Sequence, residues 1–388
     1  MALTRRRWLG AALAGSCSLG FATAGWTRAL QTGAVVGPSP YGPLGAADGN
    51  GIRLPAGFTS RLLATSGVAV AGTSQVWHFA PDGGAAFASA GGGWVYVSNA
   101  ELYSGGVGAL RFAADGSVVD AYTILSGTRI NCAGGPTPWG TWLSCEEYGR
   151  GRVWECDPQQ PGQGIVRPAL GRFSHEAAAV DPVTGIVYLT EDDDDDSRFY
   201  RFRPQRMGDL SAGVLEVAFV APDGQVSWIP VSPRRPYRGA DSTPFARGEG
   251  AWYADGVVYF CTTSDNRVWA LHTATDRLVV MYDAATLGAD APLRDPDNVT
   301  VHAPSGDVYV AEDADDLELV LLATAAGERI AAPFLQLVGH DGSEVAGPAF
   351  SPDGTRLYFS SQRGTGGRSN SPGLTYEVSG PFRTLARA

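Results

Sequence analysis

The chain has 388 residues, including 51 glycines and 25 prolines, and it carries a formal net charge of -11 without a single lysine. This length allows one large β domain or two ordinary domains, with a sizeable core in either case. The acidic balance argues against nucleic acid or an anionic membrane as a partner. An anionic substrate remains compatible with it, provided that bound cations reverse the local field.

The N-terminus has the features of a twin-arginine export signal. Arg5-Arg6-Arg7 precedes a short run rich in Ala, Gly and Leu, and Ala22-Thr23-Ala24 offers a cleavage site. The apolar run is shorter than the roughly 20 residues that a bilayer span needs, so we expect no stable membrane insertion. We predict a signal peptide over residues 1–24 and a periplasmic or extracellular protein. An oxidising destination allows disulfides, and Cys145 with Cys156 is a conceivable pair.

Residues 25–56 form a Gly- and Pro-rich lead-in, after which one unit recurs to the end of the chain. Each unit has an inner segment, a turn and an aromatic-aliphatic strand, with the ring residue of that strand at positions 96, 142, 188, 259, 309 and 358. The spacings are 46, 46, 71, 50 and 49 residues, which is typical of a β-propeller. We therefore predict an all-β fold, a six-bladed β-propeller over residues 57–388.

Three details of this propeller follow from the pattern. The long interval indicates an insertion of about twenty residues near 203–240. We expect a segment from one end of the chain, residues 58–64 or 374–378, to complete a blade begun at the other end. Pro and Asp-Gly supply the backbone angles of tight reversals, so Ala80-Pro81-Asp82-Gly83 is predicted to be a turn.

Polar and thiol groups recur where each inner segment begins. Cys132, Glu176 and Asn298, which follows Asp297, each stand six residues before a turn proline. Glu249 stands five before Ala254, which takes the proline's place in its unit. In the last unit the position is Ala346, and Glu344 lies two residues earlier. Innermost strands of a propeller begin next to its axis, so these groups are predicted to face one axial site.

The returning strands end at the same end of the axis as these groups, which we call the mouth of the axial site. Glu101 and Glu147 stand five residues after the ring position, and Glu191 and Glu312 stand three after theirs, which gives the same side by strand parity. Converging carboxylates repel strongly unless cations neutralise them. Carboxylate and amide oxygens suit Ca²⁺, whereas the Cys132 thiolate suits a softer ion such as iron or zinc. The alternative for Cys132 is a buried structural cysteine before a solvated acidic turn, in which Glu146 or Glu147 would be its neighbour.

Arg247 precedes Gly248-Glu249-Gly250, where glycines allow close backbone approach. A guanidinium beside the metal site would serve as a bidentate phosphate clamp. A structural ion pair with Glu249 explains the same residues equally well, and both interpretations stay open at this point.

Several segments in the same order resemble the PhoX-type alkaline phosphatases. The most specific is residues 131–147; the others are residues 41–44, 175–178, 247–252, 296–298 and 344–348. The chain is short for that family, and residues 98–101 and 361–364 each lack a histidine that the family pattern has there.

The resemblance implies an exported, metal-dependent phosphatase that hydrolyses small-molecule phosphate monoesters at an Fe³⁺ and Ca²⁺ cluster on the propeller axis. It implies Arg247 as the phosphate-contacting residue and Cys132 as the iron thiolate. The implied ligands shared by iron and calcium are Glu147, Glu176, Glu249, Asp297 and Asn298, and Glu101 joins the predicted metal set from the strand pattern.

We expect a monomer. Two other functions fit the residues: a non-catalytic propeller stiffened by axial calcium, and another propeller hydrolase such as a calcium-dependent lactonase.

Overall fold

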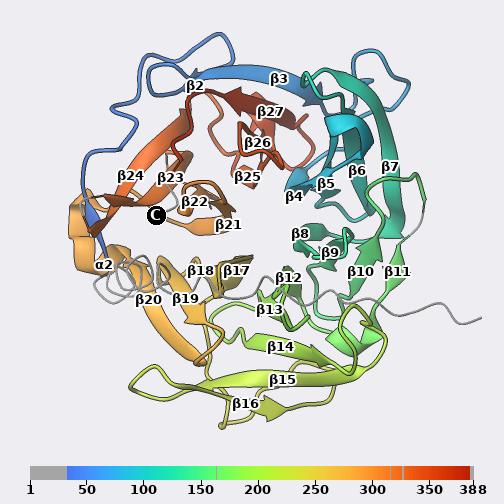
Figure 1. The fold of residues 1–388 in the computed structure, drawn as a ribbon, viewed down its shortest axis with the longest axis vertical. Coiled ribbons are helices and arrows are strands. Elements are labelled where there is room, and N and C mark those ends of the chain that lie inside the picture. The colour runs from blue at the N-terminus through green and yellow to red at the C-terminus, as the bar shows by residue number, and fades with distance from the viewer. Residues whose placement is uncertain (1–32, 163, 315, 326, 385–388) are drawn as a thin grey trace, which may run out of the picture.

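The computed structural model describes residues 33–384 except 163, 315 and 326, so the predicted signal peptide and the start of the lead-in lie outside the described residues. Within the described part, six β-sheets stand around a common axis, each with its innermost strand at the centre (Figure 1). The predicted all-β, six-bladed propeller is confirmed.

The first three blades take their strands in chain order. Blade 1 consists of β4 (Pro81–Ala88), β5 (Trp94–Ala100), β6 (Gly105–Phe112) and β7 (Val118–Thr128). Blade 2 consists of β8 (Asn131–Pro136), β9 (Trp142–Glu146), β10 (Val153–Cys156) and β11 (Ile165–Val166). Blade 3 consists of β12 (His175–Val180), β13 (Val187–Glu191), β14 (Phe199–Pro204), β15 (Gly213–Val220) and β16 (Val226–Pro230).

Blade 4 also follows chain order, whereas blades 5 and 6 include strands from the N-terminal part of the chain. Blade 4 consists of β17 (Gly248–Ala254), β18 (Val257–Thr262), β19 (Arg267–His272) and β20 (Arg277–Asp283). Blade 5 consists of β21 (Pro296–His302), β22 (Asp307–Glu312), β23 (Glu318–Ala325) and β24 (Glu328–Leu337), with β1 (Ala34–Val36) and β2 (Ile52–Arg53) both paired to β24. Blade 6 consists of β25 (Val345–Phe350), β26 (Arg356–Ser361), β27 (Leu374–Ser379) and β3 (Thr59–Thr65). Described helical segments are short: α2 (Ala284–Leu287) and the 3-10 turns η1 (Ala90–Gly92), η2 (Pro168–Leu170), η3 (Gly288–Asp290) and η4 (Gly364–Gly366).

The ring is closed in blade 6, where the two ends of the chain meet as expected. β3 pairs antiparallel with β27 over six residue pairs, from Thr59 with Ser379 to Thr65 with Leu374. The lead-in adds to this closure, because Tyr41 packs edge-on against Phe58 and Phe334. Backbone hydrogen bonds and aromatic packing thus join segments that are about 290 or more residues apart in sequence.

The long interval in the repeat is occupied by an additional strand. β16 pairs with β15 at the outer edge of blade 3, and residues 231–247 then return to the axis. This addition is peripheral, so it leaves the geometry of the six innermost strands unchanged.

The hydrophobic core consists of six clusters among the described residues, one between each pair of neighbouring blades. Cys145 lies in the cluster between blades 2 and 3, whereas Cys156 lies in the cluster between blades 1 and 2. Both thiols are free and buried. The conceivable disulfide between them is therefore wrong, because their side chains project to opposite faces of blade 2.

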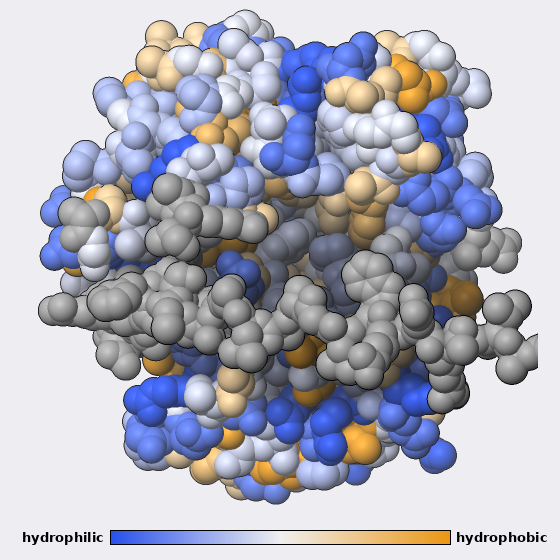
Figure 2. All heavy atoms as spheres, viewed as in Figure 1, coloured by the Kyte–Doolittle hydropathy of each residue, from blue (hydrophilic) through white to orange (hydrophobic). Residues whose placement is uncertain are grey.

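The surface differs from this interior. On the face shown in Figure 2, hydrophilic residues predominate outside the grey atoms, with hydrophobic residues scattered among them. In the part of the chain that the structure describes, no helix is long and apolar enough to cross a membrane.

The innermost strands touch one another around the axis in the order β4, β8, β12, β17, β21, β25 and back to β4. This close approach requires small residues. A Cβ added at Gly135 of β8 would lie 1.5 Å from the carbonyl oxygen of Ala178 in β12, and one added at Gly83 of β4 would lie 2.4 Å from the Cα of Ala133 in β8. The neighbouring atoms belong to backbone and cannot turn away, so glycine is required where the strands meet.

We predict that Gly135→Ala lowers the melting temperature by about 2–12 °C, since overpacking a rigid site costs about 1–3 kcal/mol and each kcal/mol lowers the midpoint of a large domain by about 2–4 °C. Gly49→Ala is the matched control, because a Cβ there meets nothing within 4 Å. Thermal unfolding of both variants checks the prediction, and equal midpoints would contradict it.

Candidate metal centre

Each innermost strand carries a β-bulge near its start. In blades 1 to 5 the bulge follows the first residue of the strand, and in blade 6 it lies one residue later. A bulge bends a strand and redirects its side chains, and it is common next to active sites. The residue before the strand has a positive φ in four blades, at Ala80, Ile130, Arg247 and Asp295. The same local geometry is therefore repeated around the axis.

The second residue of each innermost strand forms what we call the inner ring. Its members are Asp82, Cys132, Glu176, Glu249 and Asp297, with Ala346 in blade 6. The residue that follows the end of each second strand forms what we call the rim ring. Its members are Glu101, Glu147, Asp192, Thr263, Asp313 and Gln362.

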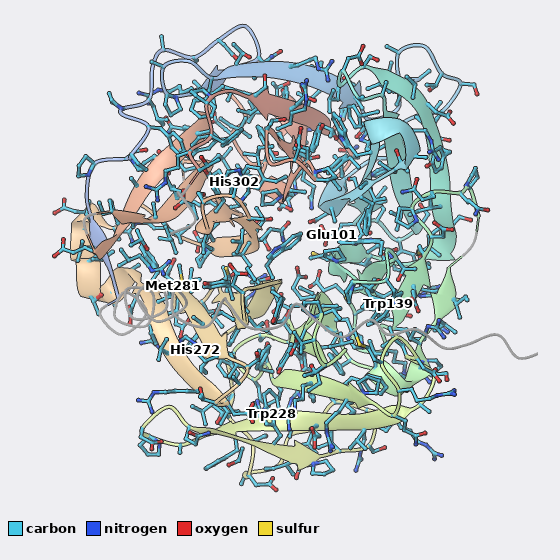
Figure 3. The ribbon with its side chains drawn as sticks, in the orientation of Figure 1. Glu101, Trp139, Trp228, His272, Met281 and His302 are labelled. Carbon is cyan, nitrogen blue, oxygen red and sulfur yellow. The ribbon has the colours of Figure 1, made fainter. Side chains whose placement is uncertain are left out.

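The two rings bring oxygen and sulfur atoms close together. Three groups of residues each have ligand atoms within 4.8 Å of one another. These groups are Glu101 with Cys132 and Glu147, Asp82 with Glu101 and Glu344, and Glu176 with Glu249 and Asp297. The first two groups share Glu101, so the donors form one arc over blades 6, 1 and 2 and a second arc over blades 3 to 5. In Figure 3 Glu101 lies near the middle of the ring, whereas the labelled His272 and His302 lie outward among the blades.

The carboxylates are buried and repel one another. Burial raises the pKa of Asp82 to about 8, with a further contribution from the charge of Glu101. Burial and the charge of Asp192 raise the pKa of Glu249, also to about 8. For Glu176 and Asp297, burial and then the charge of Glu249 raise the pKa well above its usual range. The Cys132 thiol has a raised pKa for the same reasons, first burial and then the charge of Asp82.

Glu176 is the carboxylate that points most directly to a ligand. Its side chain is completely buried, and neither carboxylate oxygen has a hydrogen-bond partner. An unpartnered buried carboxyl group costs several kcal/mol unless a cation or donor satisfies it. Because Glu249 and Asp297 offer further oxygens within reach, the residues fit a bound cation.

The Cys132 group has a different chemistry. Its Sγ lies 3.7 Å from Oδ2 of Asp82, and it belongs to the group with Glu101 and Glu147. A thiolate among carboxylates suits a transition metal next to a harder ion. Asn99 of β5 supports this position, since its Nδ2 donates to the carbonyl oxygens of Cys132 and Ala133 at 3.0 and 2.7 Å.

Asn298, the remaining predicted ligand, follows Asp297 on the bulge. Its Nδ2 donates to Oδ1 of Asp297 at 2.9 Å, and its Oδ1 accepts from the backbone N–H of Gly347 in β25 at 2.6 Å. In this structure the amide therefore orients Asp297 and joins blade 5 to blade 6.

Two arginines stand at the mouth. Arg247 lies 3.0 Å from Asp192 and 3.1 Å from Glu249, measured from Nη2 to the carboxylate oxygens. Arg363 lies 2.6 Å from Glu344, again measured from Nη2. The predicted ion pair of Arg247 with Glu249 is present, and it does not exclude a substrate role, because about a third of the Arg247 side chain is exposed.

Glu191 and Glu312 do not face the axis, so their prediction by strand parity is wrong. Glu191 accepts from the backbone N–H of Arg198 and binds Arg238 with both oxygens at 2.9 Å. Glu312 accepts from the backbone N–H groups of Arg294 and Glu318, both at 2.8 Å. Each fastens its own hairpin and supplies no axial ligand.

The cause of this error is a difference in register. In blades 3 to 6 the fifth residue of the innermost strand pairs with the ring residue of the second strand, which is Tyr188, Tyr259, Tyr309 or Tyr358. In blades 1 and 2 the fifth residue pairs instead with Val97 or Leu143 of the second strand. The ring residues of these two blades, Tyr96 and Trp142, precede Val97 and Leu143 by one residue. The rim residue therefore lies four positions after the aligned residue, which gives Asp192 and Asp313 in place of Glu191 and Glu312.

The same register decides between the two glutamates next to Cys132. Glu146 accepts from the backbone N–H groups of Arg129 and Arg152, both at 3.1 Å, as its counterparts do in other blades. Glu147 joins Cys132 and Glu101.

Asp82 was missed because its sequence has the composition of a turn. The predicted turn at residues 80–83 is wrong: Pro81 begins β4, and Asp82 takes the inner-ring position of blade 1. A usable indication was present, since Pro81-Asp82 repeats the order of Pro296-Asp297.

His175 lies off the axis, although it adjoins Glu176. Its ring is 3.6 Å from that of Phe173, and its Nε2 is 3.2 Å from the carbonyl oxygen of Gly171. Burial lowers the pKa of His175 to about 3. It is a buried neutral side chain and is unsuited to acid catalysis at the axis.

Fold and site together define a β-propeller whose axis gathers carboxylates and a thiol that could hold cations. The family model "Alkaline phosphatase PhoX" matches residues 100–152 and 148–282. Over residues 100–282 the chain is similar to the PhoX alkaline phosphatases, the family that its motifs resemble, and this similarity supports phosphate-ester hydrolysis as its class of activity.

Solved structures support the fold. The structure of Pseudomonas fluorescens PhoX in complex with vanadate, a transition state analogue, matches with a TM-score of 0.67 and 18% identity, covering 92% of this chain and 100% of that one. A protein of unknown function from Bacteroides thetaiotaomicron matches with a TM-score of 0.54 and 11% identity, covering 83% of this chain and 76% of that one. No curated protein matches the chain in sequence.

The raised pKa values predict an unusual pH dependence of stability in the metal-free protein. Asp82 and Glu249 have pKa values of about 8 in the folded state, above their usual values of 3.8 and 4.5, so the folded state binds more protons than the unfolded state up to that pH. Stability should then fall as pH rises from 6.5 to 8, by about 2 kcal/mol per pH unit for the two groups together. Thermal unfolding after chelation measures this slope, and Ca²⁺ should raise the midpoint more at pH 8 than at pH 6.5.

The double variant Asp82→Asn, Glu249→Gln is the control for that slope, because neither new side chain titrates. Its stability should fall less steeply with pH than that of the parent over the same window, and the remaining slope comes from Glu176 and Asp297, whose pKa values are also raised. A metal-free parent protein whose stability rises with pH would contradict the assignment of these carboxylates.

Glu176→Gln and Glu191→Gln separate a ligand from a structural carboxylate. We predict that Glu176→Gln raises the melting temperature of the metal-free protein and lowers the number of bound ions, since it removes an unpartnered buried acid. Glu191→Gln should lower the melting temperature, because breaking a buried pair with Arg238 costs about 3–5 kcal/mol, and leave ion content unchanged. Elemental analysis and thermal unfolding of both variants give the two readouts. A Glu191→Gln protein with a raised melting temperature would contradict the structural role of Glu191.

Proposed function

We propose that the chain is an exported phosphatase that hydrolyses small-molecule phosphate monoesters at a cluster of iron and calcium on the propeller axis. The observation that carries the proposal is the convergence of Cys132 and buried carboxylates, among them the unpartnered Glu176, in a chain that resembles the PhoX alkaline phosphatases. The P. fluorescens protein binds vanadate, a transition state analogue, and the same class of oxyanion is proposed here as the ligand.

The two arcs of donors suggest different ions. Cys132 with Glu101 and Glu147 would hold iron, because a thiolate ligand favours a transition metal. The groups made only of carboxylates, Asp82 with Glu101 and Glu344 and Glu176 with Glu249 and Asp297, would hold calcium. When bound, these cations supply positive charge that offsets the negative charge of the phosphoryl oxygens.

Arg247 supplies the guanidinium that the substrate meets at the mouth. Its partners Asp192 and Glu249 raise its pKa and keep it charged. They also fix the direction of the guanidinium, which reduces the entropy lost when it binds an anion. A planar fork of N–H donors matches two phosphoryl oxygens, and its charge would stabilise the transition state of phosphoryl transfer.

Export is part of the same proposal. Arg5-Arg6-Arg7 and the Ala22-Thr23-Ala24 cleavage site lie outside the described residues, and they suggest twin-arginine transport to the periplasm or beyond. Such transport carries folded proteins, which would allow the ions to be loaded first. We further propose that the mature protein is a monomer.

Hydrolysis of 4-nitrophenyl phosphate by protein purified after native export tests the function. We expect activity that is lost on thorough chelation, and elemental analysis that finds both iron and calcium. Arg247→Ala in the metal-loaded enzyme should lower kcat by about 100-fold or more, the effect of removing one transition-state donor, with little change in melting temperature.

Arg201→Ala is the matched control, since Arg201 also pairs with two carboxylates, Glu216 and Asp276, but lies in blade 3 away from the axis. Its kcat should be close to that of the parent. Activity that survives chelation would refute the metal-dependent mechanism. If neither parent nor variants turn over, the axial ions only stiffen the propeller, and if Cys132→Ser leaves a lactonase activity intact, the chain is a different hydrolase.

A further inference from the structure

The rim of the axial site holds a second cationic side chain, Arg363, which the proposed phosphoryl chemistry does not use. It follows directly after Gln362, the rim-ring residue of blade 6. Its backbone N–H donates to the hydroxyl of Ser343 at 2.9 Å, which fixes the start of the side chain. About 29% of that side chain is exposed.

The contacts of Arg363 are with the axial carboxylates. Nη2 is 2.6 Å from Oε2 of Glu344, and Nη1 is 3.9 Å from Oδ1 of Asp313, which is beyond hydrogen-bond distance. The charges of Glu101 and Asp82 add to those of Glu344 and Asp313 in favouring the charged guanidinium. Arg363 thus contributes positive charge at the mouth of the axial site.

Its main partner has a second possible role. Glu344 forms a group with Asp82 and Glu101 whose ligand atoms lie within 4.8 Å of one another. A cation bound by that group would compensate part of the negative charge of Glu344. The positive charge of Arg363 is then less fully compensated and can attract an anion that approaches the mouth.

Arg247 and Arg363 belong to different sides of the site. Arg247 precedes the innermost strand of blade 4, and Arg363 follows the second strand of blade 6. Blade 5 stands between these two blades, and the charge of its Asp313 favours both charged guanidiniums. An ester whose phosphoryl group is bound beside Arg247 would therefore extend its alcohol portion toward a second positive charge.

From this arrangement, and on the basis of the proposed phosphatase function, we propose that Arg363 is a specificity-determining residue that binds a second anionic group, a carboxylate or another phosphate, on the alcohol portion of the substrate. The preferred substrates are then phosphate monoesters of anionic alcohols. A guanidinium recognises either group through paired N–H donors, and a neutral alcohol portion would leave this interaction unused.

Two matched pairs of compounds test the proposal on the metal-loaded protein. The first is 4-carboxyphenyl phosphate against its carboxamide, compared by kcat/KM. The second is 3-phosphonopropionate against its amide, which are not hydrolysed and are compared by the dissociation constant from calorimetry. We expect the parent protein to prefer the carboxylate of each pair by about tenfold, the size of one charge-assisted hydrogen bond.

Arg363→Gln should abolish this preference, through KM for the esters, and Arg363→Lys should restore part of it. Arg356→Gln is the control, because Arg356 is similarly exposed but pairs with Glu377 at the other end of blade 6; it should keep the preference of the parent. Equal binding of carboxylate and amide by the parent, or an Arg363→Gln effect that is the same for both compounds, would overturn the inference while leaving the phosphatase proposal intact. A parent protein that hydrolyses neither ester and binds neither phosphonate would instead refute the phosphatase function itself.

Discussion

The close approach of six innermost strands at one axis is the constraint on which the rest of this molecule depends. Strands meet so closely there that glycine is required at Gly83 and Gly135, where any side chain would strike backbone. There is little room for water between them, so a charged group placed on these strands loses most of its solvation. Burial is accordingly the largest cause of the raised pKa values of Asp82, Glu176, Glu249 and Asp297.

The β-bulges turn that constraint into a site. A regular strand alternates its side chains between the two neighbouring blades, and such residues enter the hydrophobic clusters. The bulge interrupts this alternation near the start of each innermost strand, at the place where Cys132, Glu176 and Glu249 stand. The fold therefore gathers acids from five separate segments of the chain, and their repulsion is an unfavourable energy that bound cations would remove. Stability and ion binding are coupled for this reason.

The sequence allowed the architecture and much of this site to be predicted, because both depend on repetition. The spacing of aromatic strands indicated six blades, and counting back from the turn prolines placed Cys132, Glu176 and Asn298, with its neighbour Asp297, at the axis. What it could not provide was the exact register of each hairpin. Tyr96 and Trp142 look equivalent to Tyr188 in composition, yet they lie one residue out of register with it. This displacement is why Glu191 was predicted at the axis, where the structure has Asp192.

Asp82 illustrates a further limit. Proline, aspartate and glycine in succession favour a turn by local conformational preference, and only the pairing of β4 with β5 shows that the same residues form an innermost strand. Local preference and tertiary context conflict most where a strand is bent for function. The deviations from regular structure that define this site are thus the features for which a pattern of regular strands gives no indication.

Blade 6 departs from the other blades, and this departure gives the site a direction. Its inner-ring position is Ala346 and its rim position is Gln362, so it supplies no carboxylate at either place; Gln362 instead donates to Asp82 and Glu101 at 2.7 and 2.8 Å. Glu344 and Arg363 stand beside these positions as an ion pair. A ring of six identical acids would attract cations equally from all sides. In blade 6 one position of each ring is neutral and a guanidinium is added, which makes this side of the mouth less negative, and an anionic substrate would approach the bound ions most easily from that side.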